Sequence, residues 1–444
     1  MASQEQTTEQ IVSEEIVSLK HTLESPENEQ PEKKQSLDPV EVTTKVEDAS
    51  VNPATNVATK QDAPEVTSVE KEKRLPKKKV ALLMSYCGTG YQGMQVNPGA
   101  ITIESELFKA LIATGAVSKD NAVDQKKVGF ARAARTDKGV HAAGQVVNLK
   151  MIVEDPDIIE KINAHLPEQI HVWGYIKAMA SFHAKNHCDS RYYEYLMPSY
   201  VFIPPSGEVN SLPPVERQIP PSTAEEMAIK RQYRMSPETL TYVRSALNKY
   251  VGTHNYHNFT NGKSFKDASA KRFIMSFTCS EPKIIDGCEW LSLKVHGQAF
   301  MIHQIRKMVG LVILMARTNN PLSLMDRTFE EKKINIPKAP GIGLLLEKPV
   351  FGAYNKRAVE MGREVIQFDP YQEQMEVFKE KYIYNAMIQV ENEENFFDQW
   401  IKGIDTFPEY YTYINPEGTI PDSALICNQI PLPRISKEDK QDEE

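Results

Sequence analysis

The architecture of this chain starts from one apolar run, Val80-Ala81-Leu82-Leu83-Met84-Ser85, which gives way to a loop with three glycines, Tyr86-Cys87-Gly88-Thr89-Gly90-Tyr91-Gln92-Gly93-Met94-Gln95. A short continuous apolar run that ends at glycines is typical of a buried central strand. Apolar residues then recur at helical spacing in 102–113, until Gly115 ends the pattern. We therefore expect the folded part to open with a buried strand, a glycine-rich loop and an amphipathic helix.

Strand and helix signals continue downstream in an order that indicates a fold class. Residues 128–131 predict a second strand, and the alternation of Val147, Leu149 and Met151 with polar residues predicts a third strand with one solvated face. Asp155-Pro156 predicts the start of a helix, and strands are expected near 169–178 and 190–197. The order strand, helix, strand, strand, helix, strand is typical of a ferredoxin-like unit in the α+β class.

The second half of the chain carries signals of the same kind. Ser236-Pro237-Glu238 predicts the start of a helix that runs to about residue 250. Alternation in 290–296 predicts a half-buried strand, and 300–316 predicts a long apolar helix that a polar turn at 303–307 interrupts. This half repeats the broad α+β pattern without a repeat of individual residues.

Length and composition indicate an ordinary soluble protein with room for two packed domains. The 444 residues are 41% hydrophobic and 25% charged, as in typical globular proteins. No run of apolar residues is long enough to predict a membrane span, and the acidic N-terminus resembles neither a secretion signal nor a transit peptide. Five scattered cysteines without a C-x-x-C pair predict neither disulfides nor a zinc site, which favours a reducing compartment, the cytosol or nucleus. His187 beside Cys188 has no clustered partners, so no metal site is expected.

The net charge of −8 is concentrated in the two tails. Residues 1–70 carry −10 and no aromatic residue, and residues 435–444 carry −3, so residues 71–434 retain +5. A segment as acidic as 1–70 cannot bury enough apolar surface to fold, and we expect it to be disordered. The mildly basic remainder permits an RNA partner.

Between tail and core lies a basic cluster, Lys71-Glu72-Lys73-Arg74-Leu75-Pro76-Lys77-Lys78-Lys79. It predicts a nuclear import signal or a patch that contacts phosphates, and a plain solvated linker explains it equally well. Further on, six prolines in 203–222 predict a loop or an inter-domain insertion. The aromatic residues of 370–402 are expected to pack in a core rather than to stack on bases.

These signals divide the chain into seven predicted parts. They are an acidic tail (1–70), a basic linker (71–79), an N-terminal half (80–202), a proline-rich insertion (203–235), a C-terminal half (236–360), an appended helical region (361–434) and a second acidic tail (435–444).

The clearest candidate for chemistry is the carboxylate in the run Arg135-Thr136-Asp137-Lys138-Gly139-Val140-His141. No second carboxylate lies within three residues of Asp137, which disfavours a metal loop and a paired-carboxylate hydrolase. A lone carboxylate beside fixed positive charge stays ionised, which suits a nucleophile or a base. The same residues also make an ordinary turn, with Gly139 supplying a positive φ, so spacing alone does not decide between the two readings.

Other polar and aromatic segments give this turn its context. They are Arg191-Tyr192-Tyr193-Glu194-Tyr195, Gly252-Thr253-His254-Asn255-Tyr256-His257-Asn258-Phe259, the run from Gly297 to Gly310 that contains His303-Gln304-Ile305-Arg306-Lys307, and Ala339-Pro340-Gly341-Ile342-Gly343-Leu344-Leu345-Leu346. Together with the glycine-rich loop and the Asp137 turn, and in this order, they closely resemble the TruA family of tRNA pseudouridine synthases, in particular its eukaryotic branch. The resemblance covers about residues 77–360. One departure is Met94, where bacterial relatives favour Trp.

The resemblance implies roles for individual residues. Asp137 matches the essential carboxylate, which attacks the sugar or the uracil or assists cleavage of the glycosidic bond. Arg306 matches its ion-pair partner, and Tyr193 the tyrosine that stacks on the target base. The implied substrate-binding residues are Arg135, which helps to flip the base, Leu344, an apolar wall, and His141, Tyr91, Gln95, Lys78 and Lys79. The product is an isomer, so neither a cofactor nor a metal is implied.

The same resemblance implies a fold and partners. It implies two ferredoxin-like, RRM-like halves with merged antiparallel sheets, and a central basic cleft that grips RNA. The implied substrates are uridines in and near the tRNA anticodon stem and loop, with spliceosomal and messenger RNA as further substrates. The basic cluster at 71–79 predicts a location in the nucleus. The appended helices favour a monomer. A non-catalytic RNA-binding protein or RNA chaperone on the same fold is the main alternative, and a nucleoside hydrolase is disfavoured because no second carboxylate is present.

Overall fold

β1 (Lys77–Tyr86) contains the apolar run and is the buried strand that the sequence predicts. A computed structural model describes residues 75–207 and 212–428, all of which belong to one compact unit. Residues 80–84 are fully buried, and β1 pairs antiparallel with β3 (His141–Ile152) on one side and β4 (Ile170–Lys177) on the other. The predicted acidic tails, and the part of the basic linker before residue 75, lie outside the described residues.

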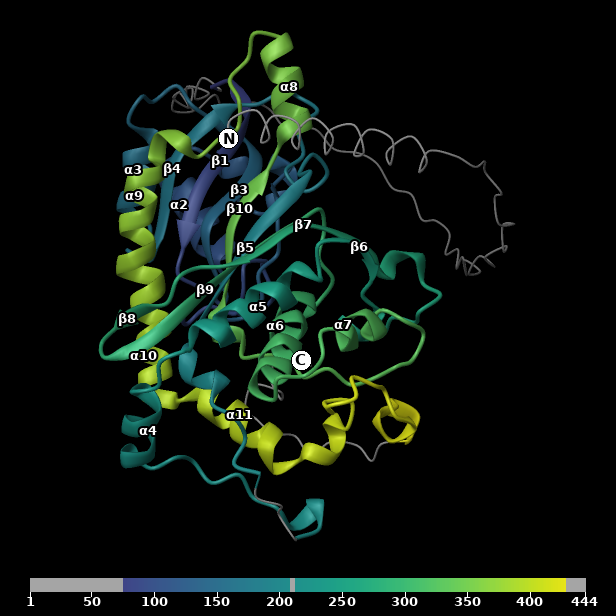
Figure 1. Ribbon diagram of the computed structural model, residues 1–444. Coiled ribbons are helices and arrows are strands. Elements are labelled where there is room, and N and C mark those ends of the chain that lie inside the picture. The colour runs from purple at the N-terminus through teal and green to yellow at the C-terminus, as the bar shows by residue number, and fades with distance from the viewer. Residues whose placement is uncertain (1–74, 208–211, 429–444) are drawn as a thin grey trace, which may run out of the picture. The chain divides into compact units, whose positions relative to one another are not determined.

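Strands from both halves of the chain form one continuous sheet (Figure 1). Its order is β4-β1-β3-β10-β5-β9-β7-β6, with β2 paired to β3 and β8 paired to β9. β10 pairs parallel with β3 and antiparallel with β5, and the other pairings in the sheet are antiparallel. The remaining strands are β2 (Ala131–Arg132), β5 (Ser190–Pro198), β6 (Gly252–Asn255), β7 (Lys271–Cys279), β8 (Lys283–Ile285), β9 (Cys288–Gly297) and β10 (Leu344–Val350). A strand from late in the chain thus lies at the centre of the sheet.

The main α-helices of the described residues cover the sheet from several parts of the chain (Figure 1). A π-helical turn, Lys379–Tyr384, joins α9 to α10, so that the two make one long helical run beside the sheet. Among the described residues, none of the helices combines the length and apolar character needed to cross a bilayer. The α-helices are α2 (Ile103–Ala113), α3 (Ile158–Ala164), α4 (Ala224–Arg231), α5 (Pro237–Asn248), α6 (Gln304–Arg317), α7 (Ser323–Thr328), α8 (Gly352–Glu360), α9 (Gln372–Phe378), α10 (Asn385–Glu394) and α11 (Phe396–Thr406).

β1 is apolar on both faces because both faces are covered. Val80, Leu82 and Met84 pack with residues of α2 and α3. Ala81 and Leu83 face the other way and pack with residues of α8 and α9 and the segment between them. A strand buried on two sides needs a continuous apolar run rather than an alternating one.

The third predicted strand, β3, was expected to have one solvated face. This prediction is wrong, because both faces of β3 are covered, as those of β1 are. β3 is buried along nearly its whole length, and Asn148 on its polar face is fully buried. The amide oxygen of Asn148 accepts the backbone N–H of Ala184, and its Nδ2 donates to the Gly129 carbonyl. The polar residue therefore joins two loops instead of facing water.

Three other local predictions are also corrected. Residues 125–128 form a 3-10 turn, and Gly129 has a φ of +62°, so the second strand is only Ala131–Arg132. The helix expected at Asp155-Pro156 begins at Ile158, since the Asp155 carboxylate accepts the N–H of Asp157 in a preceding turn. The helix expected from residue 300 begins at Gln304.

Other boundaries follow the predicted signals. Thr102 caps α2 by accepting the N–H of Ser105, and Ser236 caps α5 by accepting the N–H of Thr239. The strands expected near 169–178, 190–197 and 290–296 correspond to β4, β5 and β9. The segment 203–235 contains the short helix α4, with Met227 buried. β5 lies within the predicted N-terminal half (80–202) but pairs with β9 and β10 of the C-terminal half.

Candidate active site

The glycine-rich loop and the Asp137 turn are built against each other. Gly93 has a φ of +88°, and a Cβ there would lie 2.8 Å from the Thr136 carbonyl oxygen. The N–H of Met94 donates to that same oxygen at 3.1 Å, and the N–H of Gly139 donates to the Tyr91 carbonyl at 3.2 Å. Glycine is needed where two backbones approach this closely. The loop thus fixes the backbone that carries Asp137.

His141 ties the other end of the turn to the same loop. Its Nδ1 accepts the N–H of Gly88 at 3.1 Å, and its side chain is buried. A Cβ at Gly88 would lie 2.3 Å from the Val140 carbonyl oxygen, so only glycine fits. Burial lowers the pKa of His141 to about 4, which keeps Nδ1 available as an acceptor at neutral pH.

A buried ion pair supports the outer side of the glycine-rich loop. Glu104, on α2, is fully buried and pairs with Arg132, which lies three residues before Arg135. Its second carboxylate oxygen accepts the N–H of Val96 at 3.0 Å. Burial raises the pKa of Glu104, an effect that Arg132 opposes. This contact links α2, the loop and the approach to the Asp137 turn.

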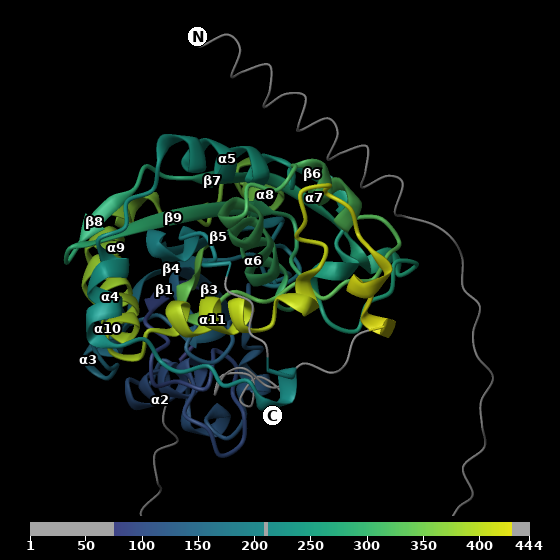
Figure 2. The same cartoon turned by 60° about the horizontal axis from the view of Figure 1, so that its bottom comes forward.

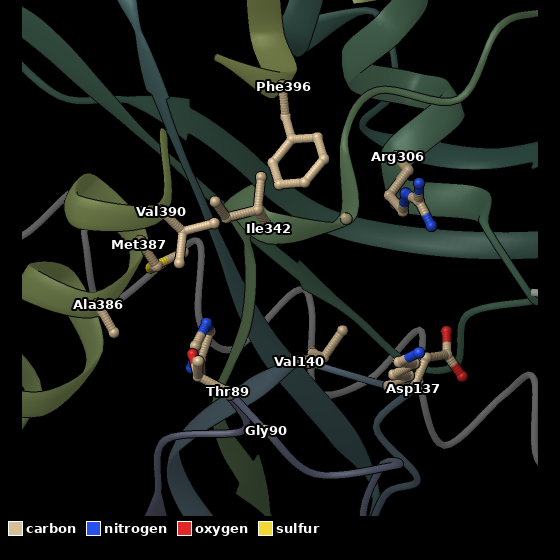
Figure 3. A pocket seen from close by; sticks show the side chains of 14 residues that line it. Thr89, Gly90, Asp137, Val140, Arg306, Ile342, Ala386, Met387, Val390 and Phe396 are labelled. Carbon is tan, nitrogen blue, oxygen red and sulfur yellow. The ribbon is translucent and has the colours of Figure 1, made fainter. Parts of the chain in front are cut away.

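A cavity of about 220 Å³ lies next to the Asp137 turn (Figure 3). Its walls come from four separate parts of the chain: the glycine-rich loop, the Asp137 turn, α6 with the segment before β10, and the C-terminal helices. The lining residues are Thr89, Gly90, Asp137, Lys138, Gly139, Val140, His141, Arg306, Gly341, Ile342, Ala386, Met387, Val390 and Phe396. The structure therefore brings Asp137, His141 and Arg306 to one cavity.

Arg306 reaches the cavity from the first turn of α6. It is buried, and its Nε donates to the Ala339 carbonyl at 2.7 Å. The N–H of Ala339 donates back to the Arg306 carbonyl at 3.1 Å, so the segment before β10 holds both the main chain and the side chain. In Figure 3 the Arg306 guanidinium and the Asp137 carboxylate face the same side of the cavity. The ion pair expected between them stays a prediction.

Tyr193 lies in β5 close to this centre. It is half-buried, and its ring packs edge-on against Phe300 with centroids 5.3 Å apart. Burial raises the pKa of Tyr193 to about 12, with a further contribution from the Asp137 charge. The phenol is therefore protonated at neutral pH, and it lies within electrostatic reach of Asp137. It suits stacking or hydrogen-bond donation rather than the role of a base.

The other predicted substrate-binding residues lie outside the lining of this cavity. Arg135 and Gln95 are exposed on the two segments that form the loop and the turn. Tyr91 is buried in the core of the N-terminal half, and Leu344 is half-buried at the start of β10.

Lys78 and Lys79 lie at the start of β1, the opposite end from the glycine-rich loop. Seven or eight residue steps at about 3.3 Å per residue separate them from that loop. The structure thus does not bring these two lysines to the cavity, and any RNA contact that they make is remote from Asp137.

Sequence reasoning missed the apolar wall that faces the Asp137 turn. It consists of Ile342 before β10, Met387 and Val390 of α10, and Phe396 of α11. The sequence assigned the C-terminal aromatics to a core, and this holds for Phe397, which is 1% exposed, whereas its neighbour Phe396 lines the cavity. Neighbouring residues at a helix start face different directions, and no motif marks which of them faces the cavity.

A kink between α10 and α11 sets the direction of Phe396. Asn395 adopts a left-handed conformation with φ of 51° and ends α10. Figure 2 shows α11 turning away from α10 at this point. The buried carboxylate of Glu391 accepts the N–H of Phe397 at 3.2 Å and a hydrogen bond from the Tyr200 hydroxyl. These contacts fix the corner that carries Phe396.

A buried ion network fastens the C-terminal helices to the sheet. Lys379, 1% exposed in the π-helical turn, donates to Glu194 of β5 at 2.6 Å and to Glu347 of β10 at 2.7 Å. Glu194 also accepts hydrogen bonds from Ser292 and Tyr384. Burial would raise the pKa of Glu194, but Lys379 outweighs it and lowers that pKa to about 2. The apolar wall is therefore attached to the strands beside the cavity.

No cluster of potential metal ligands occurs in the part of the chain that the structure describes. The polar side chains that line the cavity include the Asp137 carboxylate and the Arg306 guanidinium, opposite the apolar wall. The Tyr193 phenol is outside this lining but within electrostatic reach of Asp137. This set can hold a planar polar ring between apolar surfaces and place one ionised carboxylate beside it.

Comparison with known proteins places the chain in a family. A family described as tRNA pseudouridine synthase matches residues 246–352. The chain is 43% identical over 411 residues to tRNA pseudouridine synthase 1 of Yarrowia lipolytica, a match that covers 78% of this chain and 77% of the relative. It is also 43% identical to tRNA pseudouridine synthase 1 of Saccharomyces cerevisiae (76% and 73% covered) and 41% identical to the Pseudouridylate synthase 1 homolog of Mus musculus (75% of each chain covered). The resemblance seen in the motifs is thereby confirmed: the chain belongs to the tRNA pseudouridine synthases, enzymes that isomerise uridine to pseudouridine.

Proposed function

We propose that this protein isomerises uridines of tRNA to pseudouridine in the cavity beside Asp137. The observation that carries the proposal is that Asp137 and Arg306, far apart in the sequence, line one cavity in a chain of this family. The reaction breaks the bond between N1 of uracil and C1′ of the ribose, and forms a bond between C5 and C1′. C5 loses its proton and N1 gains one, so the reaction needs no external oxidant or reductant.

Each residue of the site has a physical role in this reaction. The target base leaves the RNA stack, at a cost of a few kcal/mol, and enters between Tyr193 and the apolar wall. The ionised Asp137 carboxylate then attacks the sugar or the base, or assists cleavage of the glycosidic bond. Arg306, held by Ala339, keeps that carboxylate charged and oriented. The cavity walls retain the detached uracil while it turns.

The first prediction tests Asp137 directly. Asp137→Ala is expected to abolish isomerisation, because no second carboxylate lines the cavity, while affinity for tRNA changes little. Release of tritium from uridine labelled at C5 in a tRNA transcript measures the reaction, and filter binding measures affinity. Asp157→Ala is the matched control, since Asp157 is an exposed carboxylate before α3 without a side-chain cap bond.

The same assay separates the proposal from its main alternative. A wild-type protein that binds tRNA but releases no tritium would be a non-catalytic RNA-binding protein or RNA chaperone on this fold. Undiminished release by Asp137→Ala would instead assign the chemistry to another residue.

The proposal extends to substrates and location. We infer that the target uridines lie in and near the anticodon stem and loop of tRNA, and that some spliceosomal and messenger RNAs are also modified. Mapping pseudouridines in cells that lack this protein tests both. The basic cluster at 71–79 supports a nuclear location, and a fluorescent fusion with and without that cluster tests it.

The proposal also covers architecture. With α4, β6, β8 and the short α7 set aside, and with β5 counted in the second half, the elements β1-α2-β2-β3-α3-β4 and β5-α5-β7-β9-α6-β10 each follow the ferredoxin-like pattern. This supports two such halves with merged sheets and the RNA cleft between them. We further infer that the protein is a monomer, because α9, α10 and α11 are added to these halves, and light scattering of the purified chain tests it.

A further inference from the structure

The environment of Lys307 disfavours the positive charge of its ammonium. It is 8% exposed on the second helical turn of α6, next in sequence to Arg306. Within the described residues its ammonium has no ion-pair or hydrogen-bond partner. Burying a charge without a partner costs several kcal/mol. An apolar side chain of the same length would fill this space without that cost.

The surroundings of Lys307 add to the cost. The N-cap of α6 at His303 makes no side-chain cap bond, so the positive end of the helix dipole acts on this turn. Two more lysines, Lys333 and Lys338, are close enough to repel it, and burial together with these charges lowers the pKa of Lys307 to about 8. The N-terminus of α6, Lys333 and Lys338 therefore all place positive charge near the poorly hydrated ammonium of Lys307.

Backbone contacts explain why the lysines lie together. A Cβ at Gly310 would lie 2.3 Å from the Pro337 carbonyl oxygen, and the N–H of Ala339 donates to the Arg306 carbonyl. The segment 337–339 thus runs along α6 beside Lys307, with Lys338 in its middle. Lys333 is held nearby, since its Nζ donates to the carbonyls of His257 and Lys263.

The three lysines, Lys307, Lys333 and Lys338, lie close to the cavity. Successive residues on a helix point in directions about 100° apart. Lys307 therefore lies on one side of α6, and Arg306, which lines the cavity, lies on another. The segment from Lys338 to Gly341 runs from the Lys307 side of α6 to the cavity, since Gly341 lines the cavity. A nucleotide whose base occupies the cavity therefore has its backbone within reach of this side of α6.

We propose that Lys307, with Lys333 and Lys338 beside it, forms a binding site for a phosphate group of the RNA backbone next to the target uridine. A phosphate supplies the negative charge that the buried ammonium and the helix N-terminus lack. The lysines bind the phosphate through its charge alone. This contact therefore positions the RNA strand without reading its base sequence. This inference rests on the proposed function, which supplies the RNA.

The test measures how tRNA affinity depends on salt. Lys307→Met is made in the full chain carrying Asp137→Ala, which prevents turnover, and the dissociation constant for a tRNA transcript is measured from 50 to 300 mM KCl. The expected result is roughly tenfold weaker binding near 150 mM salt. The slope of log affinity against log salt should fall by about 0.7 to 0.9, the loss of one phosphate contact.

Two controls separate this site from general charge effects and from misfolding. Lys356→Met removes the same charge from an exposed position on α8, at the far end of β10 from the cavity, and should change neither the affinity nor the slope by more than about a third of these effects. Lys307→Arg keeps the charge and should retain most of the affinity. The melting temperature of Lys307→Met should be equal to or above that of the parent, because a buried unpaired charge is removed.

Each contrary outcome has a definite meaning. An unchanged slope for Lys307→Met, or an equal loss for Lys356→Met, overturns the site. Thermal stabilisation by inorganic phosphate that requires Lys307, without any change in the tRNA slope, shows a site for free phosphate and overturns the RNA assignment. Absence of tritium release by the protein with Asp137 intact sinks the proposed function alone, since the salt slope is measured independently of turnover.

Discussion

At the scale of single residues, His141 helps to hold the Asp137 turn and the glycine-rich loop together. Its Nδ1 can accept the N–H of Gly88 only while the ring is neutral. Protonation puts a hydrogen on Nδ1 and removes the acceptor. The ring is buried, so a charge there would also lack solvation. Protonation of His141 in acid therefore weakens the contact between the two backbones.

A pH dependence of stability follows from this residue. Its folded-state pKa of about 4 lies below the value of 6.5 expected in the unfolded chain, so the unfolded state binds more protons between these values. Stability is then fully present above pH 6.5, and up to about 3 kcal/mol is lost as the pH falls toward 4. Urea unfolding at pH 7 and pH 5 measures the loss. His141→Asn, whose amide oxygen accepts the same N–H without titrating, should lose less over this interval, and an identical loss would contradict the assignment.

Individual site residues could be predicted from the sequence where a motif marks them. Asp137 and Arg306 stand in distinctive runs, and the structure brings both to one cavity. Lys307 was visible only as part of a polar turn, because its lack of a partner depends on burial by segments distant in sequence. Phe396 was equally hidden, since it was indistinguishable in sequence from its core neighbour Phe397.

At the scale of elements, the corner between α10 and α11 lines the cavity of the candidate active site. The left-handed Asn395 ends one helix and starts the next, and this directs Phe396 at the cavity and Phe397 at the core. Helix starts with a cap, such as those of α2 and α5, could be predicted from Thr102 and Ser236. The failures at 125–131 and 155–157 occurred where a left-handed glycine or a side-chain turn competes with the regular element.

The apolar wall predicts a measurable effect on catalysis. Phe396→Ala removes a ring from the side of the cavity opposite Asp137, so the target uridine should be held less firmly and kcat/KM should fall by about tenfold, the size expected for a lost apolar contact of 1–2 kcal/mol. Tritium release at several tRNA concentrations gives kcat and KM separately. Phe397→Leu is the control. It should lower the melting temperature of the protein, and at temperatures at which this variant remains folded its kcat/KM should equal that of wild type. A value for Phe396→Ala within twofold of wild type would exclude Phe396 from the substrate-binding wall.

At the scale of the whole molecule, the C-terminal helices pack against the sheet and are fastened to it by buried ion pairs. The segment from α8 to α9 covers one face of β1 and β3, and Lys379 of the π-helical turn joins β5 and β10 through its ion pairs with Glu194 and Glu347. The sequence indicated the α+β class and the helical character of this region. It could not show that the region closes the core and the cavity, because such contacts join residues that are far apart in the chain and carry no local signal.

The buried network predicts a large loss of stability on one substitution. Lys379→Met leaves Glu194 and Glu347 buried without their cation, and the free energy of unfolding should fall by about 3–5 kcal/mol. Lys381→Met, in the same π-helical turn but exposed, should cost much less, because it removes only a solvent-exposed contact with the Tyr382 ring. Urea unfolding followed by circular dichroism measures both. Adding Glu347→Gln to Lys379→Met should restore part of the loss, and equal effects of the two lysine substitutions would show that the network does not stabilise the fold.

The position of β10 has a consequence for synthesis of the protein. This strand lies between β3 and β5, yet it is made long after both of them. At about 5–20 residues per second, a ribosome needs several seconds to proceed from β5 to β10, and during that time the facing edges of β3 and β5 lack their permanent neighbour. The nascent chain therefore carries open strand edges, which are sites of aggregation, until β10 emerges. The cavity beside Asp137 is completed only after Phe396 has been translated, so a chain released by a ribosome that stalls earlier lacks one wall of this cavity.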